Sequence, residues 1–192
     1  MPRPKGFDPG AVVDAAMAAF WSKGYAATSA QDLVDHTGLG RGSLYNAFTS
    51  KHHLFLEALR RYDEEWTTRQ VKVLEGDGPV RDRVRRVLMT VVEEESAEAP
   101  PRRGCLAVNA AIELAGRDPG VTDLVRAIFG RMEAAFRDAL ERARHDGEIA
   151  ADRDPAVLAR YLLNSMYGLR VLGKTAGRAS MIDIVETTLT CL

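Results

Sequence analysis

The sequence lacks the features that mark membrane, secreted and nucleic-acid-coating proteins. Its 192 residues contain no run of eighteen apolar residues, so we expect no membrane-spanning helix and no membrane partner. The start, MPRPKGFDPG, has basic residues but no apolar segment, which argues against a secretory signal peptide. Only two cysteines are present, Cys105 and Cys191, and so few favour the reducing cytoplasm over a disulfide framework. A net charge of −1 argues against coating nucleic acid through bulk charge but allows a local basic surface.

Signatures of catalysis and of metal binding are missing too. The segment GLGRG is not the G-x-G-x-x-G pattern of a dinucleotide-binding loop, and no predicted strand precedes it. The four histidines, His36, His52, His53 and His145, show no metal-ligand spacing. We therefore expect no cofactor, no metal and no enzymatic activity. A helical-bundle enzyme and a purely structural helical dimer are the alternatives, and sequence-specific binding to a palindrome would separate a DNA-binding protein from both.

What the sequence does contain is helical periodicity from end to end. Asp-Pro precedes an apolar pattern three times, at Asp8, Asp118 and Asp154. This pair starts helices because Asp caps free N–H groups and proline fits the first helical position. No stretch alternates between hairpin turns, so we expect no strands. The pattern predicts an all-α fold of about nine helices, and the longer ones span residues 9–23, 51–74, 80–95, 105–115, 119–144, 155–172 and 178–189.

Two short helices lie close together in TSAQDLVDHTGLGRGSLYNAFTSK, residues 28–51. Thr28 and Gln31 have the spacing of a capping box that starts the first helix. Gly38 can take the left-handed conformation that ends it. On the second helix Leu44 and Phe48, four residues apart, share the buried face and leave a polar outer face. A helix, a tight glycine turn and a short helix with a polar outer face predict a helix-turn-helix.

At these residues the chain resembles a known family. FDPGAVVDAAMAAFWSKGYAATSAQDLVDHTGLGRGSLYNAFTSKHHLFLEAL is similar to the N-terminal region of the TetR/AcrR family of bacterial transcriptional regulators. The resemblance implies a three-helix helix-turn-helix domain at residues 1–52, continuing into the helix from residue 51, and a larger ligand-binding and dimerisation domain at residues 53–192. It also implies a cytoplasmic, ligand-responsive repressor that joins the nucleoid when bound to DNA. The matching residues are Phe20, Gly24, Thr28, Leu33, Gly38, Leu39, Gly42, Leu44, Tyr45, Phe48, Lys51 and Leu54.

The polar face of the second short helix supplies the predicted DNA contacts. We expect Arg41, Ser43 and Asn46 to contact base edges, while Tyr45, Lys51 and the helix N-termini contact phosphates and set the register. A symmetric dimer would place two such helices in successive major grooves of a palindromic operator. The alternatives are a core role for Tyr45 and merely solvated positions for the others. The full predicted set is Thr28, Ser29, Arg41, Gly42, Ser43, Tyr45, Asn46 and Lys51.

Two apolar stripes near the C-terminus predict a homodimer interface. Two helices from each subunit can form a hydrophobic four-helix bundle, which the resemblance also implies. The alternative is that one stripe faces its own domain. The predicted interface residues are Leu158, Leu162, Met166, Leu169, Met181, Ile182, Val185 and Leu189.

The helices between residues 51 and 144 are expected to enclose a pocket for an unidentified small-molecule effector of mainly apolar or aromatic character. The effector would favour a conformation whose recognition helices no longer match the groove spacing, and the operator would be released. The alternative is that the methionines and phenylalanine of the set belong to the core. The predicted lining residues are Trp66, Met89, Cys105, Asn109, Phe129 and Met132.

Cys105 has two opposite interpretations. In PPRRGCLAVNAAIEL, Gly104 and the prolines before it predict a helix start, which puts the thiol in the first turn near two arginines. Free N–H groups and cations favour the thiolate, so Cys105 could release DNA on reaction with an oxidant or electrophile. The other interpretation is a small buried core residue, a common place for cysteine.

Overall fold

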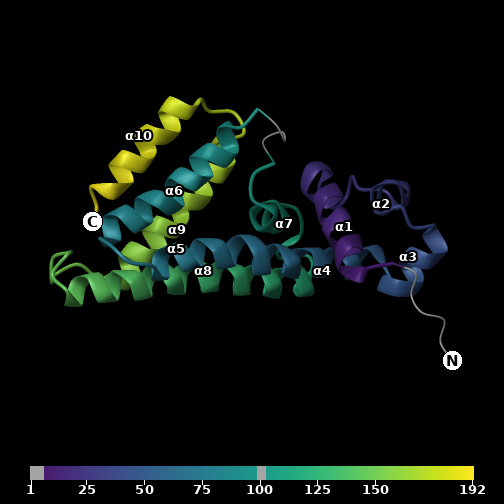
Figure 1. Ribbon diagram of the computed structural model, residues 1–192, viewed down its shortest axis with the longest axis horizontal. Coiled ribbons are helices and arrows are strands. Elements are labelled where there is room, and N and C mark those ends of the chain that lie inside the picture. The colour runs from purple at the N-terminus through teal and green to yellow at the C-terminus, as the bar shows by residue number, and fades with distance from the viewer. Residues whose placement is uncertain (1–6, 99–102) are drawn as a thin grey trace.

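The computed structural model describes residues 7–98 and 103–192, and every regular element in these parts is a helix (Figure 1). The all-α prediction is confirmed. The predicted helix over residues 51–74 is a rod of three contiguous segments, and counting the rod once gives the expected nine helices in the described parts. In chain order the elements are α1 (Pro9–Lys23), α2 (Ala30–Thr37), α3 (Arg41–Phe48), α4 (Lys51–Tyr62), the π-helical turn η1 (Asp63–Thr67), α5 (Thr68–Glu75), α6 (Val80–Ser96), α7 (Leu106–Leu114), α8 (Pro119–His145), α9 (Pro155–Leu172) and α10 (Arg178–Leu189).

The three Asp-Pro pairs start helices as predicted. Asp8, Asp118 and Asp154 are the N-cap residues of α1, α8 and α9, and proline follows each in the first turn. Each aspartate side chain accepts a first-turn backbone N–H at 2.8 to 3.0 Å. These starts depend on residues within three positions of one another, which is why the sequence predicts them.

The molecule is elongated, with the α4–η1–α5 rod lying along α8 (Figure 1). α1, α2 and α3 gather at one end, α6, α9 and α10 at the other, and α7 lies between them. With 27 residues, α8 is about 40 Å long and connects both ends. In residues 7–98 and 103–192 we find no helix with the length and apolarity needed to cross a membrane.

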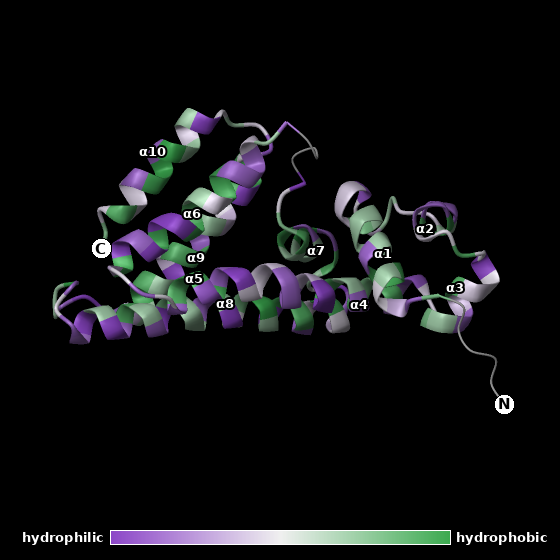
Figure 2. Ribbon diagram, viewed as in Figure 1, coloured by the Kyte–Doolittle hydropathy of each residue, from purple (hydrophilic) through white to green (hydrophobic). Residues whose placement is uncertain are grey.

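The buried side chains form two clusters, and α8 contributes to both. The first cluster joins the three N-terminal helices and α4 to α7 and the start of α8, with Phe20, Phe55 and Ile128 among its members. The second joins α5, α6, α9 and α10 to the rest of α8, around Phe136. Hydrophobic and hydrophilic residues alternate along these long helices, as amphipathic packing requires (Figure 2). The end formed by α1, α2 and α3 therefore packs directly on α7 and α8.

An aromatic cluster marks the π-helical turn in the rod. The rings of Tyr62 and Trp66 stack with centroids 5.4 Å apart and planes 6° apart. Trp21 from α1 stands edge-on to both, at 5.1 and 4.9 Å. Single π-helical turns inside α-helices occur frequently at functional sites. This one lies where α1 contacts the rod.

The structure corrects the predicted dimer stripe. α9 packs against α6, α8 and α10, so the predicted stripe faces the protein's own core, which was the alternative. Ile182 is half-buried, and the other seven residues are buried within a single chain: Leu158, Leu162, Met166, Leu169, Met181, Val185 and Leu189. The large hydrophobic side chains left exposed on α9 are Val157, Tyr161, Val171 and Leu172.

Candidate nucleic-acid interface

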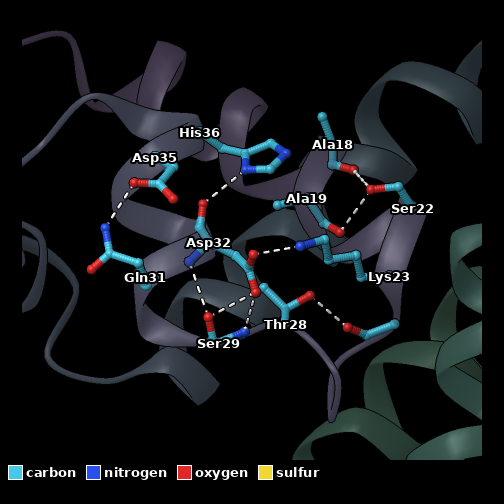
Figure 3. A network of polar contacts seen from close by, with 11 residues as sticks. Ala18, Ala19, Ser22, Lys23, Thr28, Ser29, Gln31, Asp32, Asp35 and His36 are labelled. Atoms are coloured by element: carbon cyan, nitrogen blue, oxygen red, sulfur yellow. Dashed lines mark hydrogen bonds and ion pairs between the residues drawn. The ribbon is translucent and has the colours of Figure 1, made fainter.

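The first short helix of the motif, α2, begins one residue later than predicted. Ser29 is its N-cap: Ser29 Oγ accepts the Asp32 N–H at 3.1 Å, and Asp32 Oδ2 accepts the Ser29 N–H at 2.8 Å (Figure 3). Thr28, to which the sequence assigned this role, is buried, and its hydroxyl donates to Gly24 O at 2.6 Å. The Thr28 side chain is therefore a core contact and not an open phosphate contact. Ser29 is exposed.

Asp32 also ties α2 to α1. Its carboxylate forms an ion pair with Lys23 (Figure 3). This contact, followed by hydrogen bonds from Ser29, holds the pKa of Asp32 well below its usual range. The start of α2 is thus fixed by charge as well as by packing.

The second short helix, α3, presents the polar face that the sequence predicts. Gly38 has a φ of 69° and ends α2 in the left-handed conformation. Leu44 and Phe48 are the buried residues of α3 and anchor it to the core. Because these two are four residues apart, the opposite face is free to meet DNA. Of the predicted contact residues, Tyr45 is half-buried and the others on α3 are exposed: Arg41, Gly42, Ser43 and Asn46.

The turn after α3 is strained. Thr49 has φ 64° and ψ −47°, and Ser50 N–H donates back across it to Phe48 O at 2.6 Å, which makes a γ-turn with positive φ. A β-branched residue with positive φ is an outlier, and backbone strain of this kind clusters at functional sites. Ser50 then caps α4, as predicted, by accepting the His53 N–H at 3.0 Å. The strained turn connects α3 to α4 and so sets the angle between these two helices.

Lys51 has partners of its own at the start of α4. Its Nζ lies 4.5 Å from the Tyr25 ring centroid and 3.5 Å from Ala26 O. These contacts offset the unfavourable position of a cation at a helix N-terminus, so no phosphate is needed to explain Lys51. Its contact with a DNA phosphate stays a prediction.

A capped helix, a left-handed glycine turn and a short, outwardly polar second helix are the arrangement of helix-turn-helix DNA-binding proteins. Comparison with known families agrees with this class. The family model "Bacterial regulatory proteins, tetR family" matches residues 12–58, and "Tetracyclin repressor-like, C-terminal domain" matches residues 82–189. The chain belongs to the TetR family: it is a DNA-binding transcriptional regulator and not an enzyme.

Similar proteins span the whole chain. The uncharacterized HTH-type transcriptional regulator YezE of Bacillus subtilis (strain 168) is 35% identical, over 100% of both chains. The HTH-type transcriptional repressor ComR of Escherichia coli (strain K12) is 28% identical over 97% of this chain and 90% of its own. Among solved structures, a cysteine mutant of the TetR family transcriptional regulator CifR, complexed with 26bp double-strand operator DNA, is 33% identical over 98% of both chains, with a TM-score of 0.87.

Polar contacts from α7 and the residue before Cys105 hold the helix-turn-helix end in place. The Glu113 carboxylate on α7 accepts the backbone N–H groups of Tyr25 and Ala26 at 2.8 and 2.6 Å, so it clamps the turn between α1 and α2. Trp21 Nε1 donates to Gly104 O at 2.9 Å. The partners are more than eighty residues apart in sequence, so no local pattern could have predicted these contacts.

A polar contact also joins the starts of α4 and α8. His52 Nε2 lies 2.7 Å from Asp118 Oδ2. The pKa of Asp118 is lowered because its carboxylate accepts the Val121 N–H and faces His52. This contact links the start of α8 directly to α4, the helix that follows α3.

Part of the predicted effector set lies together. Trp66, Cys105 and Met132 line one small cavity, here called the central cavity, between the rod, α7, α8 and α9. Phe129 lies against one of its walls, with its ring centroid 4.5 Å from that of Tyr167. The central cavity holds about 20 Å³, room for about one water molecule. A molecule larger than water fits only if these helices move apart.

Two predicted effector residues lie elsewhere. Met89 packs against the second hydrophobic cluster on α6, and this corrects its assignment to the pocket. Asn109 donates to Arg103 O at 2.9 Å and accepts from Lys174 Nζ at 3.0 Å, outside the central cavity. Both residues are half-buried, and helical periodicity does not say which cavity a half-buried face meets.

The sequence analysis missed the polar lining of the central cavity. Tyr62, Gln70, Tyr167 and Arg170 all line it. Burial raises the pKa of both tyrosines, so their hydroxyls stay protonated and can donate. Within the described residues, Gln70 Oε1 is buried without a hydrogen-bond partner. The Tyr62 hydroxyl donates to Cys105 Sγ, so the cavity offers the Tyr167 hydroxyl as a donor and the Gln70 amide oxygen as an open acceptor.

Cys105 is the N-cap residue of α7, one position before the predicted first turn. Its side chain is buried, with 3% of the residue exposed, and its Sγ accepts a hydrogen bond from Tyr62 Oη at 3.1 Å. In this conformation the thiol is a core residue at the wall of the central cavity.

Proposed function

We propose that this protein is a cytoplasmic, homodimeric repressor that binds a palindromic operator and releases it when a small effector enters the regulatory half. The observation that carries the proposal is the outer face of α3, where Arg41, Ser43 and Asn46 are exposed on a helix anchored only by its opposite side. Two likenesses support it: CifR in complex with operator DNA, and the repressor ComR.

The DNA contacts can be tested by salt dependence. Lys51→Ala should weaken binding to every sequence and lower the slope of log affinity against log salt by about 1, since one phosphate contact is lost. Lys72→Ala on α5 is the matched control, because Lys72 is an exposed lysine outside the helix-turn-helix. Wild-type affinity and slope in Lys51→Ala would remove Lys51 from the contact set.

We place the dimer interface on the outer faces of α9 and α10. Four large hydrophobic side chains are exposed on α9, and a groove of about 410 Å³ between α9 and α10 is lined by Tyr161, Leu172 and Ile184 among others. An exposed apolar face of this kind suits a bundle of two helices from each subunit. Tyr161→Glu should give a monomer by light scattering. The control is Ile112→Glu, at a residue 75% exposed on α7, which should leave the mass unchanged; a dimeric Tyr161→Glu would refute this placement.

We place the effector in the central cavity. Its small volume links binding to movement, because an effector must separate the rod from α8 and α9 before it fits. The rod includes α4, which packs on α1, so the movement reaches the DNA-binding end. A mainly apolar molecule with a donor for Gln70 should dissociate the operator from wild type at lower concentration than from Gln70→Leu. Equal responses in the two proteins would place the effector elsewhere.

Reaction of Cys105 with an electrophile is a second candidate signal, supported by the place of its thiol at the wall of the central cavity. The thiol must first be uncovered, so the reaction requires the same opening. Operator release by a mild electrophile should be lost in Cys105→Ser and kept in Cys191→Ser. If Cys105→Ser responds like wild type, Cys105 is a core residue only.

A further inference from the structure

A second cavity, here called the seam cavity, lies where α1 of the DNA-binding end meets the regulatory half. It holds about 210 Å³ and is lined by Trp21, Trp66, Glu94, Glu95, Arg103 and Arg170 among others. Trp66 and Arg170 also line the central cavity, so these two side chains separate the cavities. The seam cavity is much the larger of the two, and one of its lining residues, Trp21, belongs to α1.

One wall of the seam cavity is acidic and lacks a donor. Glu95 is 2% exposed, and its Oε1 accepts from Arg170 Nη1 at 3.1 Å. The same Nη1 lies 2.5 Å from Glu94 Oε2, so two carboxylates share one guanidinium. Glu95 Oε2 is buried, and nothing in the described parts of the chain donates to it. A buried carboxylate oxygen without a donor is unfavourable, so the wall is short of one N–H or O–H group.

Glu95 packs closely against the backbone at the end of α9. A Cβ at Gly173 would lie only 2.5 Å from Glu95 Cβ, so glycine at the end of α9 is what lets Glu95 approach this closely. Glu95 is therefore held between α6 and α9 with its charge directed away from bulk water. A carboxylate that only formed a surface ion pair would need no such approach.

The facing wall is aromatic. The Trp21 and Trp66 rings meet at 86° with centroids 4.9 Å apart. The guanidinium of Arg103 lies 4.2 Å from the Trp21 ring centroid, so this indole already binds a cation in the free protein. Arg103 is half-exposed, and within the described residues Glu95 pairs with Arg170 and not with Arg103. Arg103 therefore does not supply the donor that Glu95 Oε2 lacks.

We infer that the seam cavity binds a small organic amine, whose ammonium group donates to Glu95 Oε2 and whose aromatic or aliphatic body packs against Trp21 and Trp66. An ammonium group supplies the missing donor and places a positive charge beside two carboxylates, and a carboxylate supplies neither. Amine binding itself does not rest on the proposed function. The effect of the amine on operator binding does rest on it: contact with Trp21 would shift α1 against Gly104 and so weaken operator binding.

Binding is tested with the full-length protein without DNA, by calorimetry and tryptophan fluorescence. The probes are benzylamine, phenethylamine and tryptamine, each paired with the carboxylate of the same body: benzoate, phenylacetate and indole-3-acetate. At least one amine should bind at least tenfold more tightly than its carboxylate, and Glu95→Gln should reduce that affinity at least tenfold. Glu93→Gln, at an exposed glutamate of the same helix, is the matched control and should bind like wild type.

Several results would overturn the inference. No amine binding below about 10 mM, or equal binding of the carboxylates, would make Glu95 and Arg170 a structural ion pair only; this comparison uses wild type and holds even if Glu95→Gln fails to fold. Full amine affinity in a folded Glu95→Gln would also refute the site. Operator affinity is then measured with the bound amine. Unchanged operator binding would refute the link to regulation and leave the amine site intact, whereas no operator binding at all would refute the proposed function alone.

Discussion

Removing the carboxylate of Glu113 should loosen the DNA-binding end. Its two oxygens accept the Tyr25 and Ala26 N–H groups at 2.8 and 2.6 Å, so Glu113→Ala deprives both donors of this acceptor. A hydrogen bond to a charged group contributes about 1.5 to 3 kcal/mol net. Because the site is half-exposed and water can replace part of each bond, we expect a loss of about 2 kcal/mol in all. Glu113→Gln keeps one acceptor and should lose about half of that.

The assay is urea denaturation followed by tryptophan fluorescence and circular dichroism, with operator affinity measured on the same samples. Glu113→Ala should lower the free energy of unfolding and weaken operator binding, since the turn between α1 and α2 is no longer held. Glu93→Gln, an exposed glutamate on α6, should change neither. A Glu113→Ala protein with the wild-type free energy of unfolding and the wild-type operator affinity would show that the clamp has no role.

Three further changes test the helix-turn-helix itself. Thr49→Gly should raise the free energy of unfolding by about 1 kcal/mol, because glycine relieves the positive-φ strain; a loss of stability would contradict the γ-turn. Leu44→Ala should cost about 2 to 5 kcal/mol and abolish operator binding, since Leu44 is fully buried and is one of two anchors of α3; a cost below 1 kcal/mol would contradict its burial. The pKa of Asp32 is lowered by Lys23, so its carboxylate stabilises the fold above the ordinary pKa near 4, and this is lost as the pH falls further. Acid unfolding of Asp32→Asn should therefore depend less steeply on pH below about 4 than that of wild type, and an identical profile would refute the effect.

The features that the sequence predicts correctly are those set by residues close together in the chain. The Asp-Pro helix starts, the left-handed Gly38 and the cap at Ser50 each involve partners within about four positions. The same holds for the two anchors of α3. The cap of α2 was misplaced because Thr28 and Ser29 are both good N-cap residues, and only the burial of Thr28 decides between them.

Features that depend on partners far along the chain could not be predicted. Periodicity shows that Leu158, Leu162 and Leu169 share a face of α9, but it cannot say whether that face meets the protein's own α8 or a second subunit. Both faces of α9 carry apolar residues, so the sequence allows either register. The buried pairing of Glu95 with Arg170 spans 75 residues and interrupts no local pattern, so nothing in the sequence marks it.

Sequence-specific operator binding through α3 is the central claim, and selection of bound fragments from bacterial genomic DNA tests it most directly. Wild type should select a palindrome with half-sites about one helical turn, or a small multiple, apart. Arg41→Ala or Asn46→Ala should relax selection at one base position in each half-site, at a cost of about 1 to 3 kcal/mol. Arg126→Ala, at an exposed arginine of α8, should select the wild-type palindrome. Fragments without a common palindrome, or a palindrome that both α3 variants select as wild type does, would contradict the account.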